Sequence, residues 1–201
     1  MLDRAQNIKV ILFDVDGVLT DGSIWLFPAP DGVGNAASRP ADSSAAGGST
    51  ILSRSNMIEA KGFNAHDGTG ISLARLGGLK TGIVTKRISE AVALRARDLK
   101  LDYVFQGAHR KGDVLDKILA EDQLRENEIC YVGDDVIDLP IMRRCGLAIA
   151  VANARPQVLA IAHYTTPSRG GEGAARDAVE YVLKAQGKLD DVIEAYISDR
   201  R

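Results

Sequence analysis

Two aspartates, Asp14 and Asp16, stand at the end of an apolar run in the stretch VILFDVDGVLTDG. Side chains two residues apart point to the same side of an extended strand, so we expect the two carboxylates to emerge together. At about 4 Å and an effective dielectric constant of about 20, their repulsion would amount to roughly 4 kcal/mol. A pair of this kind at the end of a buried strand therefore needs a positive partner.

A second acidic cluster follows a second apolar run. The stretch YVGDDVID contains Asp134, Asp135 and Asp138. If the two apolar runs form neighbouring strands, their ends gather several carboxylates into one pocket. Oxygen ligands without an accompanying His or Cys favour a hard cation, and Mg²⁺ is the cation that we expect.

Two further residues complete a set suited to phosphate chemistry. Thr85 ends the apolar run KTGIVT, where its hydroxyl and the following amides could bind phosphoryl oxygens, and Lys111 begins a helical pattern in GAHRKGDVL. Taken singly, such residues are usually a strand-end hydroxyl and a solvated lysine. Taken in order with the two acidic clusters, they predict stabilisation of the charge on a transferred phosphoryl group.

Strand and helix patterns alternate along most of the chain and would position these residues. We expect a doubly wound, mostly parallel α/β sheet of the Rossmann-like kind, because near-continuous apolar runs suit strands covered on both faces. In such sheets the ligand site lies beyond the carboxyl ends of the strands, which is where Asp14 falls. The expected strands are 10–15, 80–85, 103–105, 128–133 and 147–151, and the expected helices are 67–77, 88–99, 111–121, 135–145 and 154–161.

One segment interrupts this alternation. Residues 28–50 are rich in Pro, Ala, Gly and Ser and lie between SIWLF and ILSRSNMIEAKGF, which could pair as a hairpin. We expect a single domain over residues 1–201 in which 28–50 is a flexible insertion at the hairpin tip. A functional lid is the alternative.

The overall composition is that of an ordinary globular protein. The 201 residues are 45% hydrophobic and 26% charged, with a formal net charge of −2. This balance lacks the basic footprint of a nucleic-acid or acidic-membrane binder, and we see no run of membrane length and no signal peptide. We therefore expect a cytoplasmic protein with no nucleic-acid or membrane partner, and Cys130 and Cys145 as buried, reduced thiols.

The motifs together resemble those of the haloacid dehalogenase superfamily of phosphotransferases. DVDGVLTDG, Thr85, Lys111 and GDDVID match its four motifs in order. The stretches GFNAHDGTGI, VFQGAHRK, RGGEGAARD and AQGKLD resemble the small phosphatases that act on 3-deoxy-D-manno-octulosonate 8-phosphate. This resemblance covers nearly the whole chain except 28–56. It implies a haloacid dehalogenase-type fold that carries a small β-hairpin in place of a cap domain.

The resemblance also implies roles for the acidic residues. Asp14 would attack phosphorus and become an aspartyl phosphate, while Asp16 would protonate the departing sugar oxygen and then deprotonate water. Mg²⁺ would be held by the side chains of Asp14 and Asp134 and by the backbone carbonyl of Asp16. Asp135 and Asp138 would orient these ligands. The implied catalytic set is Asp14, Asp16, Thr85 and Lys111.

Substrate recognition follows from the same resemblance. The implied substrate-binding residues are Asp16, Asn64, Ala65, His66, Asp67, Gly68, Lys86, Arg87, Arg95 and Lys111. Three positions depart from the family pattern, because His66 and Ser72 stand where relatives carry Arg and Lys86 where many carry Gly. A nine-carbon keto-sugar acid 9-phosphate of the sialic-acid type is therefore an alternative substrate.

The resemblance further implies a homotetramer in which a neighbouring subunit helps to close each site, and a role in lipopolysaccharide precursor synthesis. A non-hydrolytic receiver-like phosphoacceptor domain is an alternative of another class, because it also uses clustered acids, a Thr and a Lys. In receivers, however, the acidic pair precedes the phosphorylated Asp and the Lys closes the set. Here Asp16 follows Asp14, and a further acidic cluster follows Lys111, which favours the phosphatase.

Overall fold

The computed structural model describes residues 2–28 and 57–198, and a parallel sheet forms its centre. Six strands lie in the order β5-β4-β1-β6-β7-β8, and all their pairings are parallel. Strand β1 is central, with Phe13 opposite Ile83 of β4 and Val132 of β6. The strands are β1 (Val10–Phe13), β4 (Lys80–Val84), β5 (Tyr103–Phe105), β6 (Ile129–Gly133), β7 (Leu147–Ala150) and β8 (Tyr164–Thr165).

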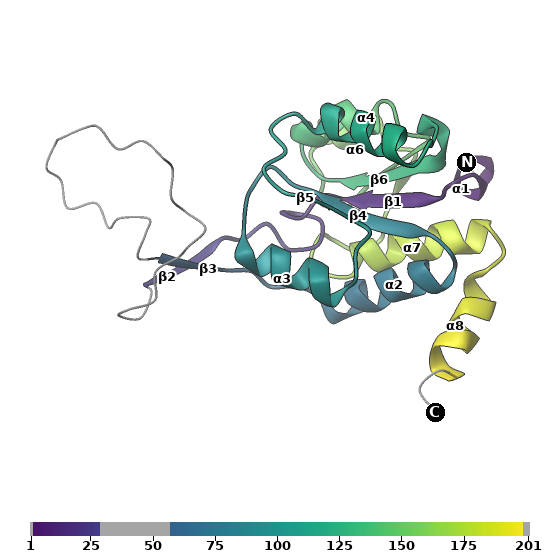
Figure 1. Cartoon of the computed structure of the whole chain (residues 1–201), viewed down its shortest axis with the longest axis horizontal. Coiled ribbons are helices and arrows are strands. Elements are labelled where there is room, and N and C mark those ends of the chain that lie inside the picture. The colour runs from purple at the N-terminus through teal and green to yellow at the C-terminus, as the bar shows by residue number, and fades with distance from the viewer. Residues whose placement is uncertain (1, 29–56, 199–201) are drawn as a thin grey trace, which may run out of the picture.

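Helices cover both faces of this sheet, α4 and α6 on one face and α2 and α7 on the other (Figure 1). Every residue of β1, β6 and β7 is buried, which explains their continuous apolar runs. The α-helices are α1 (Leu2–Gln6), α2 (Ala65–Leu76), α3 (Glu90–Asp98), α4 (Lys111–Glu121), α5 (Leu139–Met142), α6 (Pro156–Leu159), α7 (Ala174–Ala185) and α8 (Leu189–Ser198). Two 3₁₀ helices are η2 (Glu126–Glu128) and η3 (Val136–Asp138).

The predicted doubly wound α/β architecture is confirmed, and the helix predicted at 111–121 has those bounds. The helix predicted at 135–145 is wrong as a continuous element, since the chain forms η3 and then the short α5. The reason is that the Asp138 side chain turns back to accept the backbone N–H groups of Asp134 and Asp135, which tightens this turn. The helix predicted at 154–161 shrinks to α6, and α1, β8 and α8 were not predicted.

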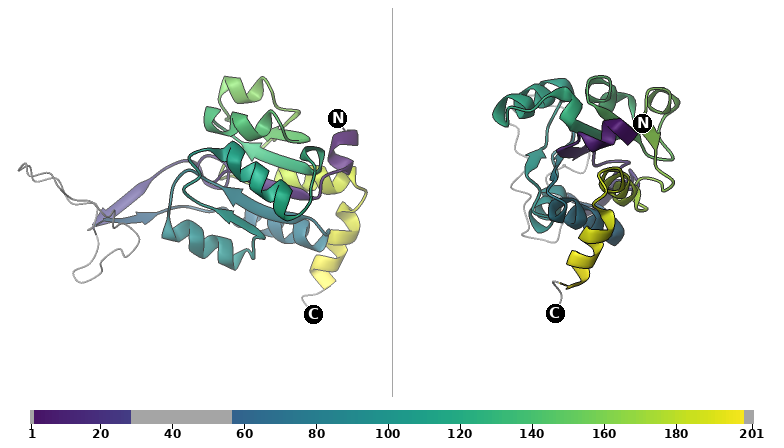
Figure 2. Two further views of the ribbon diagram at one scale, coloured as in Figure 1. Left: turned by 45° about the horizontal axis from the view of Figure 1, so that its top comes forward. Right: turned by 90° about the vertical axis from the view of Figure 1, so that its right-hand side faces the viewer.

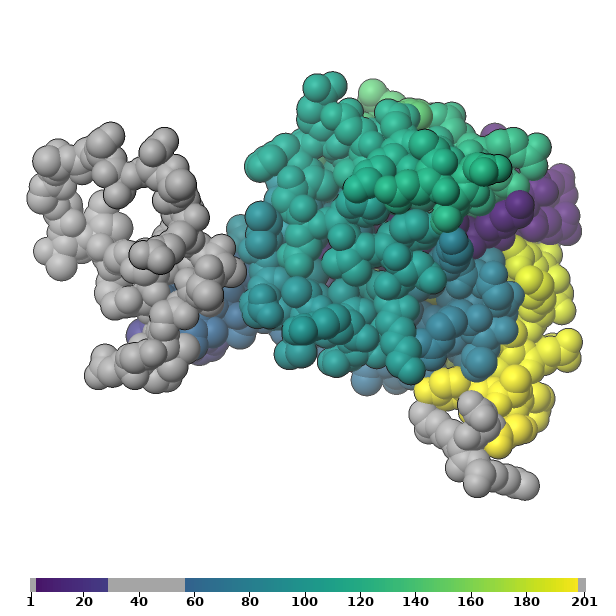
Figure 3. Space-filling model, viewed as in Figure 1, coloured from purple at the N-terminus to yellow at the C-terminus, as the bar shows by residue number. Residues whose placement is uncertain are grey.

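A separate antiparallel hairpin projects from the body, formed by β2 (Trp25–Pro28) and β3 (Met57–Ala60) (Figures 1 and 2). Part of the hairpin is visible beside the body in the space-filling view (Figure 3). The predicted pairing of the two flanking segments is thus confirmed, while the predicted insertion at 28–50 lies outside the described residues apart from Pro28. All four residues of β2 are exposed, and Trp25 and Phe27 are among them. Such side chains are suited to burial against another copy, and the homotetramer stays a prediction.

Two further expectations concern membrane spans and thiols. Among the described helices, none combines the length and the apolar character that a membrane crossing requires. Cys130 and Cys145 are buried and form no disulfide, as predicted.

Candidate active site

Asp14 is the first residue after β1 and is almost fully buried, with 2% of its surface exposed. Its backbone N–H donates to the carbonyl of Val132 at 3.0 Å and so extends the pairing of β1 with β6. The chain then turns sharply, because the backbone N–H groups of Val18, Leu19 and Thr20 all donate to the carbonyl of Val15. This turn, residues 14–22 and hereafter the Asp14 turn, presents Asp14 at the carboxyl edge of the sheet.

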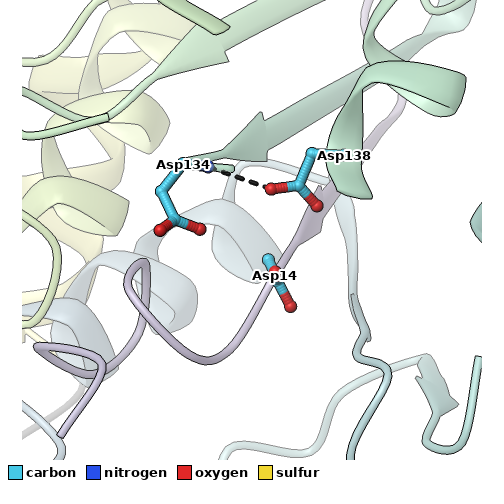
Figure 4. Close-up of side chains that lie close together, drawn as sticks. All are labelled: Asp14, Asp134 and Asp138. Atoms are coloured by element: carbon cyan, nitrogen blue, oxygen red, sulfur yellow. Dashed lines mark hydrogen bonds between the residues drawn. The ribbon is translucent and has the colours of Figure 1, made fainter. Parts of the chain in front are cut away.

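Asp134 and Asp138 reach the same edge from the neighbouring strand β6. Because β1 and β6 are adjacent and parallel, their carboxyl ends lie side by side, as the sequence predicts. Asp14, Asp134 and Asp138 each offer a carboxylate oxygen, and these oxygens lie within 4.8 Å of one another (Figure 4). The structure therefore brings together acidic residues that are more than 100 positions apart in the chain.

One ammonium group joins two of these carboxylates. The Nζ of Lys111, the first residue of α4, lies 2.8 Å from Oδ2 of Asp14 and 2.7 Å from Oδ1 of Asp138. The hydroxyl of Tyr131 on β6 lies 2.8 Å from the same Oδ1 of Asp138 and accepts from Lys111 at 3.1 Å. Lys111 and Tyr131 are both buried, so this network is shielded from water and its members fix one another's positions.

The cluster carries unfavourable electrostatics. Burial, followed by repulsion from Asp138, raises the pKa of Asp14 to about 7 against an opposing effect of Lys111. Burial and the neighbouring Asp138 and Asp14 likewise raise the pKa of Asp134 to about 7. One lysine does not compensate three carboxylates, and the free energy of the site would fall if a further cation entered it.

The donor set fits a hard divalent cation. Oδ1 of Asp134 is buried and has no hydrogen-bond partner among the described residues. Each oxygen of Asp138 accepts from two donors, Lys111 and Tyr131 on one side and two backbone N–H groups on the other, whereas each oxygen of Asp14 has one partner, Lys111 or the N–H of Val15. We therefore expect Asp14 and Asp134 to hold such an ion and Asp138 to orient them.

Asp16 points to a different set of partners. One carboxylate oxygen pairs with the Nζ of Lys61, and the other lies 3.7 Å from Nε of Arg87. Arg87 in turn pairs with Glu59 of the hairpin at 2.6 Å. Asp16 is thus within two residues of Asp14 in the chain but belongs to a second charged group, which consists of Asp16, Glu59, Lys61 and Arg87.

Thr85 and Lys86 lie at the exit of β4. The backbone of Thr85 is held by the N–H of Ala108 and by the carbonyl of Phe105, at 3.0 and 2.9 Å, and the residue is 2% exposed. Lys86 lines a cleft of about 400 Å³ together with His109, Arg110, Lys111 and Ile137. This cleft places cationic side chains beside the buried lysine of the acidic cluster.

The segment predicted to contact substrate, Asn64 to Gly68, forms the cap and first turn of α2. The Asn64 side chain accepts from the N–H of His66 at 2.8 Å and donates to the carbonyl of Gly171 at 3.2 Å. Ala65 and His66 are exposed. Part of this segment therefore has a structural task at the start of the helix.

Asp67, Gly68 and Arg95 lie on the inner side of the same turn. Asp67 is buried, which raises its pKa, and it accepts from the N–H of Arg176 at the start of α7 at 3.1 Å. Arg95 packs over the ring of Phe63 with 5.8 Å to the centroid, and an added Cβ at Gly68 would lie 2.6 Å from its guanidinium. Asp67 thus links α2 to α7, a contact that the sequence did not predict.

The glycine loop, residues 169–173 between β8 and α7, packs against the Asp14 turn. The N–H of Gly171 donates to the carbonyl of Val18 at 2.9 Å, and the N–H of Gly170 donates to Oδ1 of Asn153 at 2.9 Å. A Cβ at Gly170 would overlap the carbonyl of Gly17, and a Cβ at Gly17, whose φ is 90°, would overlap the carboxylate of Asp134. The backbones therefore approach more closely here than any residue with a side chain allows.

Sequence reasoning missed Tyr131, Glu59, Lys61 and Asn153. A signal for Tyr131 exists, since a hydroxyl in the middle of a buried strand needs a polar partner. We find no comparable signal for Lys61, because its partner Asp16 lies 45 residues away across the hairpin.

Comparison with known proteins places this geometry among hydrolases. A family model described as haloacid dehalogenase-like hydrolase matches residues 84–176. The Escherichia coli (strain K12) protein named 3-deoxy-D-manno-octulosonate 8-phosphate phosphatase is 34% identical over 191 residues, which cover 95% of this chain and 87% of that protein.

Solved structures of similar proteins match this chain over nearly its whole length. A probable YrbI family phosphatase from Pseudomonas syringae is 40% identical with a TM-score of 0.79, and the match covers 98% of this chain and 96% of that one. The 3-deoxy-D-manno-octulosonate 8-phosphate phosphatase of Moraxella catarrhalis, solved with a magnesium ion, a phosphate ion and a KDO molecule, is 30% identical with a TM-score of 0.79 and 97% coverage of both chains.

The acidic cluster predicts a pH dependence of stability in the metal-free protein. In the folded state the pKa of Asp14 and of Asp134 is raised to about 7, whereas in the unfolded chain both carboxyl groups have a pKa near 3.8. The folded state therefore binds more protons between these values, and the contribution of these groups to the free energy of unfolding falls as pH rises from 4 to 7. We expect Asp134→Asn, measured by urea unfolding with a chelator, to be more stable than the wild type at pH 8 but not at pH 4.

Asp191→Asn is the matched control, because Asp191 is exposed on α8 and we expect no such difference. Addition of Mg²⁺ at pH 8 should stabilise the wild type more than Asp134→Asn. A lower stability of Asp134→Asn in the metal-free protein at pH 8 would show that the cluster is not repulsive.

Because the backbones of the glycine loop and of Gly17 approach closely, we expect the stability of the fold to be sensitive to a methyl group added at Gly170. Gly170→Ala should reduce the free energy of unfolding by roughly 1–3 kcal/mol, because the new Cβ must displace the carbonyl of Gly17. Gly62→Ala is the control, since no atom lies within 4 Å of its Cβ position. Urea unfolding of the two variants tests this, and equal effects would contradict the packing described here.

Proposed function

Because the chain belongs to the haloacid dehalogenase-like hydrolases, and within them to the 3-deoxy-D-manno-octulosonate 8-phosphate phosphatase family, we propose that it hydrolyses this phosphate monoester with the aid of Mg²⁺. The observation that carries the proposal is the gathering of Asp14, Asp134 and Asp138 at the carboxyl edge of the sheet, where a buried lysine, Lys111, contacts Asp14 and Asp138.

Asp14 is the nucleophile in this proposal. Its carboxylate attacks phosphorus, the bond to the sugar oxygen breaks, and the phosphoryl group is carried as an aspartyl phosphate until water hydrolyses it. Lys111 holds Oδ2 of Asp14 at 2.8 Å, and the N–H of Val15 holds Oδ1 at 2.7 Å, so the carboxylate has one orientation. Mg²⁺, when held by Asp14 and Asp134, supplies the positive charge that the phosphoryl group and the cluster both require.

Asp16 is the general acid and base. It donates a proton to the departing sugar oxygen and later accepts one from the attacking water, which contributes typically about 10²–10⁴-fold to the rate. Thr85 and Lys111 stabilise charge on the phosphoryl oxygens, Thr85 by its hydroxyl and Lys111 by its ammonium group. Lys86 adds a cation at the wall of the adjoining cleft.

The family supports a sugar-acid phosphate as the substrate. The positions at which this chain departs from the family pattern bear on whether that sugar acid has eight or nine carbons. His66 is exposed in the first turn of α2, whereas the hydroxyl of Ser72 donates to the carbonyl of Gly68 at 3.1 Å. Arg87 is shared between Glu59 and Asp16. We propose the eight-carbon acid phosphate, and the nine-carbon acid phosphate is the alternative that a direct comparison must reject.

The nucleophile can be tested directly. Asp14→Asn should lower kcat for release of inorganic phosphate by at least about 10³-fold, because an amide does not attack phosphorus. Asp191→Asn should leave kcat unchanged, and removal of Mg²⁺ with a chelator should abolish release in the wild type until Mg²⁺ is restored. Full activity of Asp14→Asn would reject Asp14 as nucleophile, and a stable acyl phosphate without release would favour the receiver-like alternative.

The substrate class requires a separate comparison. We expect kcat/KM for 3-deoxy-D-manno-octulosonate 8-phosphate to exceed that for nine-carbon keto-acid 9-phosphates and for simple sugar phosphates by about tenfold or more, which corresponds to about 1.4 kcal/mol of transition-state binding. Initial rates over a panel of such esters measure this. Equal and slow turnover of the whole panel would reject the sugar-acid assignment while leaving the phosphatase assignment intact.

A further inference from the structure

We propose that Lys61, which directly follows the hairpin strand β3, is a positioning residue that holds the carboxylate of Asp16 in the orientation needed for proton transfer. This inference rests on the proposed role of Asp16 as the general acid. It adds to that role a residue outside the four motifs and assigns the hairpin a part in the chemistry.

The environment of Lys61 is unusual for a lysine. Its side chain has no exposed surface, and its Nζ pairs with Oδ1 of Asp16 and lies 3.5 Å from Oε1 of Glu59. A buried ammonium group has no water to bind, so these carboxylates are the groups that stabilise its charge. Loss of this contact would leave a buried charge without compensation, and the pairing is therefore strongly favoured.

The second cation near Asp16 does not provide the same restraint. The Arg87 side chain is 44% exposed, its Nε lies 3.7 Å from Oδ2 of Asp16, and its guanidinium forms the shorter contact, 2.6 Å, with Glu59. A long ion pair that is open to solvent contributes little. Lys61 thus fixes Oδ1 of Asp16, and Oδ2, with only the longer contact, is the oxygen that we expect to carry the proton to the leaving oxygen.

The four charged groups also connect separate parts of the fold. Asp16 belongs to the Asp14 turn, Glu59 and Lys61 to the hairpin and its exit, and Arg87 to the loop after β4. Two carboxylates and two cations alternate around this group, so each charge has opposite neighbours. The hairpin therefore positions the acid, whereas the sheet positions the nucleophile.

A positioning role differs from a purely structural one in how the rate depends on the leaving group. An alkyl oxygen such as that of a sugar phosphate must be protonated as it departs, whereas p-nitrophenolate leaves without a proton. A variant with a misoriented Asp16 should therefore be slow with the sugar-acid phosphate and nearly normal with p-nitrophenyl phosphate. A variant with general structural damage should be slow with both.

The experiment compares Lys61→Met with Lys61→Arg on both esters in the full-length protein with Mg²⁺. We expect Lys61→Met to lower kcat for the sugar-acid phosphate by roughly 10–100-fold, with little change in KM, and kcat for p-nitrophenyl phosphate by less than about 3-fold. Lys61→Arg should recover most of the loss. Lys80→Met is the control. Lys80 is the first residue of β4, at the end of the strand away from the site, and pairs with Asp122 at 2.6 Å, so this substitution should change the rate with neither ester.

Two outcomes would overturn the inference: equal losses on the two esters, or no loss on either. Should Lys61→Met fail to fold, Lys61→Gln in the Asp16→Asn background tests the same point, because a residue that acts through Asp16 should cause no further loss once Asp16 cannot transfer a proton. Failure of the wild type to hydrolyse either ester would instead reject the proposed function, so the two failures are distinguishable.

Discussion

The structure depends on one electrostatic constraint, the gathering of two buried carboxylates and a half-buried third beside a single ammonium group. Lys111 contacts Asp14 and Asp138 at 2.8 and 2.7 Å, and Asp134 retains a buried oxygen without a hydrogen-bond partner among the described residues. Burial of like charges is unfavourable unless a cation compensates it. The same imbalance that destabilises the metal-free site thus favours a divalent ion there and, in the reaction that we propose, a phosphoryl group beside that ion.

The geometry of this cluster is maintained by segments that carry none of its charges. The glycine loop packs on the Asp14 turn, with the N–H of Gly171 donating to the carbonyl of Val18, while the side chain of Asn64 at the start of α2 donates to the carbonyl of Gly171. Asp67 joins α2 to the start of α7, directly after that loop. Because a small displacement of reacting groups costs a large factor in rate, these supports contribute to any reaction at the cluster.

The site has two halves with different origins. One half contains Asp14, the proposed nucleophile, and the acidic residues that follow β6, and it is built on adjacent central strands whose residues are fully buried. The other half contains Asp16, the proposed general acid, which is held by Lys61 and Arg87 from the hairpin exit and from the loop after β4. In a fold where a small hairpin stands in place of a cap domain, this arrangement would give the hairpin a direct influence on the reaction.

The sequence by itself determined the strands of the sheet centre, the position of Asp14 at a strand end, its meeting with Asp134, and the start of α4 at Lys111. These features follow from local apolar patterns and from the rule that parallel strands present their carboxyl ends together. Only the tertiary structure decided that Asp16 turns to Lys61, that Tyr131 joins the lysine network, and that Asp67 is buried against α7. Each of these depends on pairings between distant residues, and the pattern of a single segment contains no information about the partner that folding brings to it.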